Sequence, residues 1–139
     1  MSVLLDTCIL NELRRPDGHP AVKAAVDGLA DDSLFLSVLT VGEIVKGVAH
    51  LADGPKRRGL IAWLNELENR FAGRILTVDR ETAALWGEVT ARSRKVGVVI
   101  PPVDGLIAAT ALRYNMRVMT RNTRDFRTTG VPVLDPWTD

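Results

Sequence analysis

Val3-Leu4-Leu5-Asp6-Thr7-Cys8 opens the chain with a short apolar run that ends directly on an acid. Comparable runs, rich in apolar residues, occupy residues 34–38, 75–78, 117–120 and 132–134. Runs this short, with little polar alternation, are typical of strands that are buried on both faces of a sheet. We therefore expect residues 3–5 to form the first strand of a sheet that lies inside the protein.

The segments between these runs carry apolar residues at helical spacing. They predict helices over residues 7–13, 20–29, 40–52, 55–71, 79–96 and 103–114. Thr40, followed three residues later by Glu43, predicts a capping box at the start of the third helix, and Asp79 or Thr82 is expected to cap the fifth. Short strands that alternate with helices indicate an α/β fold, with a mainly parallel sheet covered on both faces. No repeat or long linker interrupts residues 1–139, which we interpret as one domain.

Composition narrows the classes of function. The chain of 139 residues carries 18 Lys and Arg against 17 Asp and Glu, so its net charge of +1 argues against coating nucleic acid by charge alone. One cysteine, Cys8, rules out a disulfide framework or a Cys-rich metal centre, and two histidines argue against a multi-histidine centre. No apolar run approaches the roughly 20 residues of a membrane span, and no signal peptide is visible. We expect a cytoplasmic protein without membrane contact.

Acidic side chains follow the predicted strands at several places. Asp6 ends the first strand, Glu43 lies near the start of the helix after the second strand, and Asp104 lies in the first turn of the most apolar helix. Asn122 and Asp125 come after the strand at residues 117–120. Because ligands of open parallel sheets bind beyond the carboxyl ends of the strands, we expect these side chains to lie at one edge.

Each acid also has a structural interpretation. Asp6 suits the cap of the following helix, Asp104 suits a helix N-terminus, and Glu43 suits the reciprocal position of the capping box. Taken together, however, carboxylates at one edge repel one another and raise each other's pKa, a conflict that a divalent cation removes. Oxygen ligands without His or Cys favour Mg²⁺ or Mn²⁺ over zinc. Such a site predicts phosphoryl transfer or phosphodiester hydrolysis.

Other chemistries lack their parts. The chain has neither a Walker-type glycine loop nor a Gly-x-Gly-x-x-Gly motif. Cys8 has no apparent histidine partner, so we interpret it as a packed helix residue rather than a nucleophile. Aromatic residues make up only 5% of the chain, which argues against a sugar cleft, and Trp63 and Trp86 fall on apolar helix faces as core or interface residues.

Four segments, in this order, resemble the PIN-domain ribonucleases, and in particular the VapC toxins of bacterial toxin–antitoxin pairs, including their FitB-like branch. The segments are Val3-Leu4-Leu5-Asp6-Thr7, Leu39-Thr40-Val41-Gly42-Glu43-Ile44, Pro102-Val103-Asp104-Gly105-Leu106-Ile107-Ala108-Ala109-Thr110-Ala111 and Thr120-Arg121-Asn122-Thr123-Arg124-Asp125-Phe126. The resemblance extends from the first strand to the Pro136-Trp137 tail, nearly the whole chain. It implies a five-stranded parallel sheet.

The resemblance also implies a site. Asp6, Glu43 and Asp104 would hold Mg²⁺ or Mn²⁺ in an acidic pocket, with the fourth acid of the family in residues 122–125. We place Asp125 as that charge and as the fourth catalytic acid, and Asn122 as a neutral ligand or water holder. Thr7 and Thr120 would support the pocket. The first motif of the family usually reads Asp-Thr-Asn, whereas this chain has Asp6-Thr7-Cys8 and so lacks an amide near the pocket.

The activity implied by the resemblance is that of an endoribonuclease toxin, which hydrolyses RNA phosphodiester bonds and is inhibited by a cognate VapB-type antitoxin. Arg121 and Arg124 flank the pocket and are the candidate rim for RNA. The resemblance further implies a homodimer, and a heterotetramer or larger complex with the antitoxin. Operator DNA would be contacted only through the antitoxin, since no helix-turn-helix is evident in this chain.

Two other functions are compatible with parts of the pattern. The first is a PIN-like binding protein with weakened catalysis, which acts mainly in an antitoxin and operator complex. The second is a phospho-acceptor signalling domain, which also gathers acids around Mg²⁺. That class needs an acceptor Asp after a central strand and a Lys after a later one, and Asp79 and the Thr120-Arg121 pair match it poorly.

Overall fold

Five short strands form one parallel sheet in the computed structural model, which describes residues 1–138. They are β1 (Val3–Leu5), β2 (Leu34–Ser37), β3 (Ile75–Leu76), β4 (Arg117–Met119) and β5 (Val133–Leu134). Their order across the sheet is β3-β2-β1-β4-β5, and each neighbouring pair is parallel. In the centre, Leu4 lies opposite Phe35 on one side and Val118 on the other. The expected five-stranded parallel sheet is confirmed.

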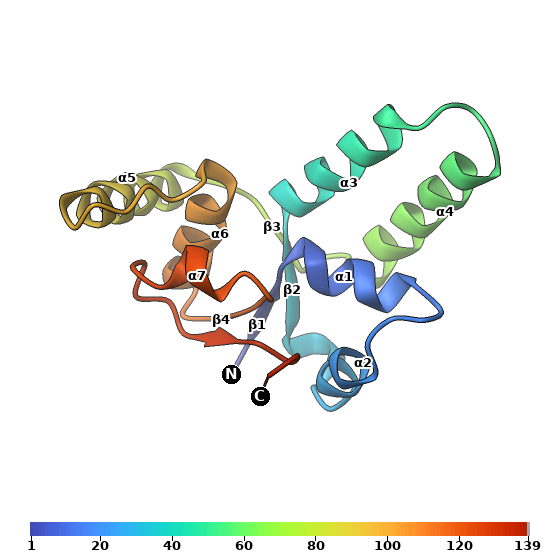
Figure 1. Ribbon diagram of the computed structural model, residues 1–139, viewed down its shortest axis with the longest axis horizontal. Helices are drawn as coiled ribbons and strands as arrows, with labels where there is room; N and C mark the ends of the chain where they lie inside the picture. The colour runs from blue at the N-terminus through green and yellow to red at the C-terminus, as the bar shows by residue number, and fades with distance from the viewer. Residues whose placement is uncertain (139) are drawn as a thin grey trace.

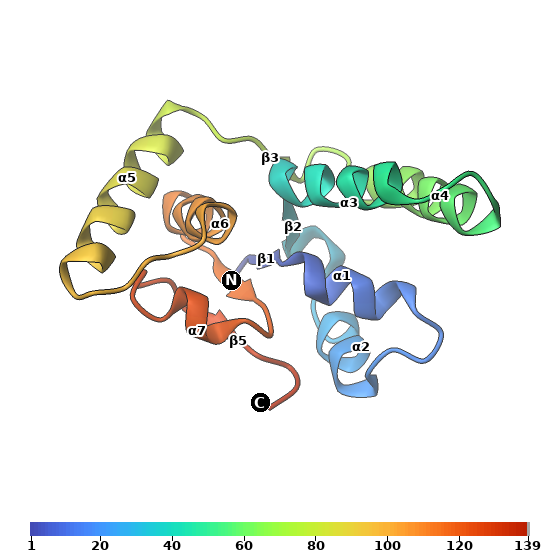
Figure 2. The same cartoon turned by 45° about the horizontal axis from the view of Figure 1, so that its top comes forward.

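Helices cover both faces of this sheet, as Figures 1 and 2 show. One group consists of α1 (Thr7–Arg14), α2 (Pro20–Asp27), α3 (Val38–His50) and α4 (Pro55–Arg70), and the other of α5 (Arg80–Lys95), α6 (Pro102–Arg113) and α7 (Thr123–Phe126). The six predicted helices are present, whereas α7 and the short 3₁₀ turn η1 (Asp31–Ser33) were not predicted. None of the helices in residues 1–138 is long and apolar enough to cross a membrane.

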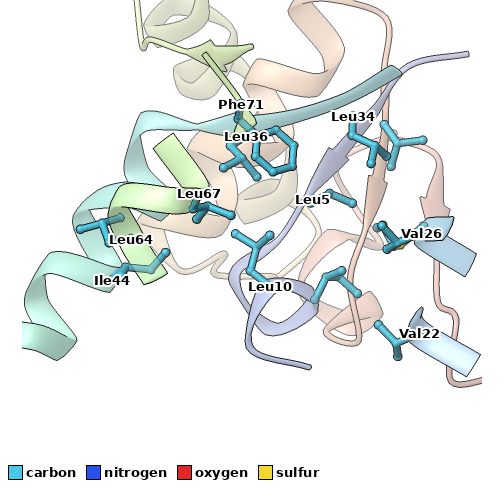
Figure 3. Packing of buried hydrophobic residues seen from close by; sticks show 13 residues of the cluster. Leu5, Leu10, Val22, Val26, Leu34, Leu36, Ile44, Leu64, Leu67 and Phe71 are labelled. Atoms are coloured by element: carbon cyan, nitrogen blue, oxygen red, sulfur yellow. The ribbon is translucent and has the colours of Figure 1, made fainter. Parts of the chain in front are cut away.

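The apolar run of β1 contributes to two separate cores. Val3 and Leu5 pack with Leu10 and other side chains of α1 to α4, in the cluster shown in Figure 3. Leu4, which points to the other face, packs with Ile107 of α6 and the second cluster. Successive residues of a strand point to opposite faces, so an unbroken apolar run is what a sheet covered on both sides requires.

The predicted capping box at Thr40 is wrong. The helix α3 begins at Val38, and its cap is Ser37, whose Oγ accepts a hydrogen bond from the Leu39 amide at 3.1 Å. Thr40 is buried inside the helix, and within the described residues its hydroxyl has no hydrogen-bond partner. Two hydroxyl side chains compete for the cap, and the end of β2 at Ser37 selects the earlier one. Glu43 is therefore free of any capping role.

Asp79, one of the two predicted caps, begins α5. Its Oδ1 accepts a hydrogen bond from the Thr82 amide at 2.8 Å, and its Oδ2 accepts one from Arg113 of α6 at 3.1 Å. The Thr82 amide, followed by Arg113, lowers the pKa of the Asp79 carboxyl to about 2. These contacts fasten α5 to α6, and because both carboxylate oxygens are engaged they argue against a phospho-acceptor role for Asp79.

Candidate metal centre at the carboxyl edge of the sheet

The predicted site residues lie where strands end and helices begin. Asp6 separates β1 from α1, Glu43 lies in the second turn of α3, and Asp104 lies in the first turn of α6. Asn122 caps α7 and Asp125 lies within it, just after β4. A parallel sheet brings these points to the same edge, as the sequence predicted.

Asp6 is only 4% exposed, and its carboxylate is held at both oxygens. Oδ1 accepts a hydrogen bond from the Thr7 amide at 2.8 Å, and Oδ2 accepts one from the Thr120 hydroxyl at 2.7 Å. Such bonds offset the free energy lost when a carboxylate leaves water. Asp6 caps α1, as expected from its position directly before this helix. Because a carboxylate has about four lone-pair positions, capping leaves it able to bind a cation.

Asp104 is the acid that the others affect most. Burial is the first cause that raises its pKa, to about 7, and the second is a hydrogen bond between its carboxyl and that of Asp125. The negative charges of Asp6, Asp125 and Glu43 add to the effect. The fold therefore brings the predicted carboxylates within electrostatic reach of one another, and burial together with these neighbours raises the pKa of Asp104 toward neutral pH.

Glu43 reaches the site from the exposed side of α3. Its Oε1 accepts a hydrogen bond from the Thr7 hydroxyl at 2.8 Å. Thr7 therefore joins the first turn of α1 to α3, and it also donates its amide to Asp6. The family resemblance assigned Thr7 a supporting role, and this geometry explains how Thr7 would orient two of the acids.

The Thr120 hydroxyl connects β1 with the segment after β4. It is buried, donates to Asp6, and accepts a hydrogen bond from the Asn122 amide at 3.0 Å. The Cys8 sulfur lies 3.6 Å from the same hydroxyl and accepts a hydrogen bond from the Arg121 amide at 3.5 Å. Burial raises the pKa of the Cys8 thiol, so the thiolate that nucleophilic catalysis requires is disfavoured.

The side chain of Asn122 differs from those of the acids. Asn122 is exposed, and within residues 1–138 its side-chain amide makes no hydrogen bond. The backbone of Asn122, rather than its side chain, is bound to Thr120. The proposed role of Asn122 as a neutral ligand thus has no contact of its own in this structure, whereas Asp125 is placed directly against Asp104.

The oxygen atoms of these acids are ligands that suit a hard divalent cation. The gathered side chains offer carboxylate oxygens, and the perturbed pKa of Asp104 reflects negative charge that a cation would offset. Among residues 1–138, no three His, Cys, Asp or Glu side chains are already close enough together to form a closed ligand cage. Asp6 and Glu43 are instead turned toward hydroxyl groups, and Asp104 toward Asp125.

Two surface features border the acids. A groove of about 620 Å³ runs along α3 from Thr7 and Glu43 to Lys46 and His50. The predicted rim residue Arg121 lies on another side, where its guanidinium carbon is 5.1 Å from the centre of the Trp137 ring. Arg124, the other predicted rim residue, lines a cavity next to Asp125 together with Arg127, which the sequence analysis did not single out.

Fold and site together define a parallel α/β protein that gathers carboxylates at the carboxyl edge of its sheet. A family profile described as "PIN domain" matches residues 3–131 of this chain. The chain belongs to the PIN domain family, and the resemblance found in its four motifs is confirmed.

Two curated relatives extend over almost the whole chain. Toxin FitB of Neisseria gonorrhoeae is 38% identical over 138 residues, covering 99% of this chain and 99% of the relative. VapC ribonuclease Y4jK of Sinorhizobium fredii is 34% identical over 139 residues, covering 97% of each. The fold matches a solved structure of FitAcB from N. gonorrhoeae with a TM-score of 0.92 at 38% identity, covering 97% of this chain and 98% of the other. A structure of FitAB bound to the IR36 DNA fragment matches with the same TM-score and identity, covering 97% and 95%.

Proposed function

We propose that this chain is the metal-dependent endoribonuclease toxin of a toxin–antitoxin pair. The observation that carries the proposal is the Asp104 carboxyl, whose pKa is raised to about 7 by burial and by the neighbouring Asp125, Asp6 and Glu43. A divalent cation would neutralise this gathered negative charge, and strongly perturbed pKa values cluster at functional sites. Membership of the PIN domain family, and relatives named as a toxin and as a ribonuclease, support the same reaction class.

Asp6, Glu43, Asp104 and Asp125 would hold Mg²⁺ or Mn²⁺, with Asn122 as a further neutral ligand. When bound, such an ion activates water and stabilises the leaving oxygen of a phosphodiester. The protein contributes orientation: Thr120 holds Asp6, and Thr7 holds Glu43, each through a hydroxyl hydrogen bond. Partners that orient metal ligands are usually important for metal affinity. We infer that both threonines are positioning residues.

RNA is the substrate class that we assign to this edge. Glu43 is exposed and Asp104 and Asp125 are half-buried, so the site is open on one side, where a single strand or a loop has easier access than the interior of a duplex. The negative pocket repels phosphate until a cation and nearby basic side chains offset its charge. An RNA substrate also agrees with the cytoplasmic location that the sequence predicts.

A VapB-type antitoxin is the proposed partner. The groove along α3 starts at Thr7 and Glu43, so a bound peptide segment with a cationic side chain would reach the acids and block them. Two similar structures are of FitAcB and of FitAB, the latter bound to a DNA fragment. We infer a homodimer that forms a heterotetramer or larger complex with the antitoxin, through which operator DNA would be contacted.

A second function is favoured by one feature of the pocket. Cys8 replaces an amide residue of the family motif, and its sulfur makes weak contacts with the Arg121 amide at 3.5 Å, the Thr120 hydroxyl at 3.6 Å and the Asp6 carboxylate at 3.9 Å. A less firmly held site is compatible with a binding protein that acts mainly within an antitoxin and operator complex. Mn²⁺ binding without RNA cleavage would indicate this second function.

Cleavage of RNA by the purified, antitoxin-free chain tests the first function. End-labelled structured RNA would be incubated with Mg²⁺ or Mn²⁺, or with EDTA, beside the variant Asp104→Asn and the control Asp32→Asn. Asp32 is exposed and makes no ion pair with the described residues, so its variant should cleave like the parent. Discrete metal-dependent cuts that only Asp104→Asn loses are expected. Equal cutting by all three proteins would refute the assignment.

The fourth acid is tested separately. Asp125→Asn should reduce cleavage more than Asn122→Ala, because Asp125 contacts Asp104 whereas the Asn122 side chain makes no hydrogen bond within the described residues. Initial cleavage rates at saturating Mg²⁺ would be compared. A more severe loss in Asn122→Ala would reverse the assignment of the two residues.

A further inference from the structure

A separate cavity lies directly beside the acids, on the side of α7. It has a volume of about 430 Å³ and lies between the loop that joins α5 to α6 and the residues at and after α7. Its lining consists of Gly97, Val98, Val99, Arg124, Asp125 and Arg127, with Thr128 at one end. Asp125 is shared with the candidate metal centre, because its carboxyl also bonds to Asp104. The cavity and the acid site are therefore neighbours with a common wall.

The two arginines of this cavity have uncompensated charge. Arg124 and Arg127 are three residues apart, a spacing that places side chains on the same face of a helical turn. Both are exposed, and within residues 1–138 neither forms an ion pair or an aromatic contact. The nearest acid in sequence, Asp125, is turned toward Asp104.

Most other arginines of the chain are engaged in structural contacts. Arg57 pairs with Asp53, Arg70 and Arg74 pair with Asp31, and Arg113 pairs with Asp79 and Glu81. Arg124 and Arg127 differ from these arginines, because their side chains line a cavity beside the acids and make no ion pair within the described residues.

The segment that carries these arginines is firmly attached. Phe126 is buried in the second core, and the Thr129 hydroxyl donates to the Phe126 carbonyl oxygen at 2.6 Å. Arg92 of α5 donates to the Thr129 carbonyl oxygen at 3.0 Å, and the Ser93 and Thr128 hydroxyl groups are 2.8 Å apart. The cavity is consequently built on a braced backbone, from which both arginine side chains line the same cavity.

We propose that this cavity is a phosphate subsite, in which Arg124 and Arg127 bind a backbone phosphate of single-stranded RNA adjacent to the phosphodiester at the acids. The proposal rests on the proposed nuclease function. Guanidinium groups bind phosphate oxygens through paired hydrogen bonds, and two of them in one cavity can hold a single phosphate together. On the opposite wall, the side chain of Val99 is 74% exposed and offers apolar contact to a sugar or a base.

The salt dependence of RNA binding tests the subsite. Fluorescence anisotropy of a labelled oligouridine would be measured with fixed Mg²⁺ in the Asp104→Asn background, which prevents cleavage under the proposed function. The variant Arg124→Gln with Arg127→Gln would be compared with the control Lys56→Gln with Arg58→Gln. The control removes the same charge from α4, which Figures 1 and 2 place on the far side of the molecule from α7.

The subsite variant should bind RNA about tenfold more weakly than its parent at low salt. The slope of log affinity against log salt should fall by about 0.7, the value for one lost phosphate contact on a single strand. The control should keep the parent slope. An unchanged slope in the subsite variant, an equal change in the control, or no measurable RNA binding by the parent would overturn the subsite.

These results are distinguishable from failure of the nuclease function itself. If the unaltered chain makes metal-dependent cuts while the subsite variant keeps the parent's salt slope, only the subsite is refuted. If the unaltered chain and Asp104→Asn do not differ in cleavage, the nuclease function fails, and the subsite proposal that rests on it fails with it.

Discussion

Replacing Asp104 by Asn should stabilise the metal-free protein, and the gain should depend on pH. The pKa of Asp104 is raised from 3.8 to about 7 in the folded state. In the unfolded chain the proton leaves near the lower value, so between the two values the folded state binds more protons. The stability of the parent therefore falls as pH rises through this window, and the fall is complete above pH 7. Asn carries no charge, so the variant does not undergo this loss of stability.

The magnitude follows from the pKa values. At about 1.4 kcal/mol per pKa unit, a change from 3.8 to about 7 corresponds to roughly 4 kcal/mol of folding stability if the whole shift contributes. Asp104 is only half-buried, so solvent screening reduces this to about 1–2 kcal/mol. For a chain of this size, each kcal/mol changes Tm by about 3–4 °C. We expect Asp104→Asn to melt about 3–8 °C above the parent near pH 8.

Thermal unfolding followed by circular dichroism in EDTA measures this directly. The difference in Tm between variant and parent should be close to zero at about pH 3, where the carboxyl is protonated in the folded state and mostly protonated in the unfolded state. Asp32→Asn serves as the matched control, since it removes an exposed carboxylate at a distance from the acids. A difference that stays constant from about pH 4 to about pH 8 would refute the crowding of carboxylates around Asp104.

The same thermal unfolding experiment can be repeated with metal ions added. Mg²⁺ or Mn²⁺ should raise the Tm of the parent, because an ion that binds only the folded state at ten times its Kd stabilises by about 1.4 kcal/mol. Asp104→Asn should respond less, since it lacks one charged ligand. An equal response of both proteins would argue against Asp104 as a ligand.

Three further predictions concern contacts around the site. Thr120→Val removes the hydroxyl that donates to Asp6, and should lower stability by about 1–3 kcal/mol in urea unfolding and slow RNA cleavage; an unchanged rate would contradict a positioning role. Asp79→Ala removes the carboxyl that caps α5, and the pKa of this carboxyl is lowered from 3.8 to about 2. The variant should therefore melt below the parent at neutral pH, and this difference in Tm should vanish as pH falls from 3.8 toward about 2. Leu36→Ala, at a fully buried core position, should lose about 2–5 kcal/mol with an unchanged urea slope.

Much of the fold was predictable from apolar runs and helical spacing. The run at residues 3–5 coincides with β1, and the six longer helices begin and end within a few residues of their predicted limits. α7 was missed because its four residues are too short to show a helical period. The cap of α3 was misplaced because Ser37 and Thr40 offer the same hydroxyl chemistry, and only the length of β2 decides between them.

The candidate site was predictable in its members but not in its connections. Asp6, Glu43 and Asp104 stood out because acids follow buried strands or begin apolar helices. The hydrogen bond from Thr120 to Asp6 joins residues 114 positions apart, and no local pattern encodes that contact. Likewise, Arg121 and Arg124 looked equivalent in sequence, whereas the fold places one over Trp137 and the other beside Asp125.

By itself, then, the sequence determined the order of strands and helices, the parallel sheet and the set of acids at its edge. These features depend on periodicity and on residue type, which act over short distances along the chain. Only the tertiary structure decided the raised pKa of Asp104, the attachment of Glu43 to Thr7 and the placement of Arg124 and Arg127 in one cavity beside Asp125. Coulomb forces and hydrogen bonds depend on distances in space, and those distances exist only once separate helices are packed against the sheet.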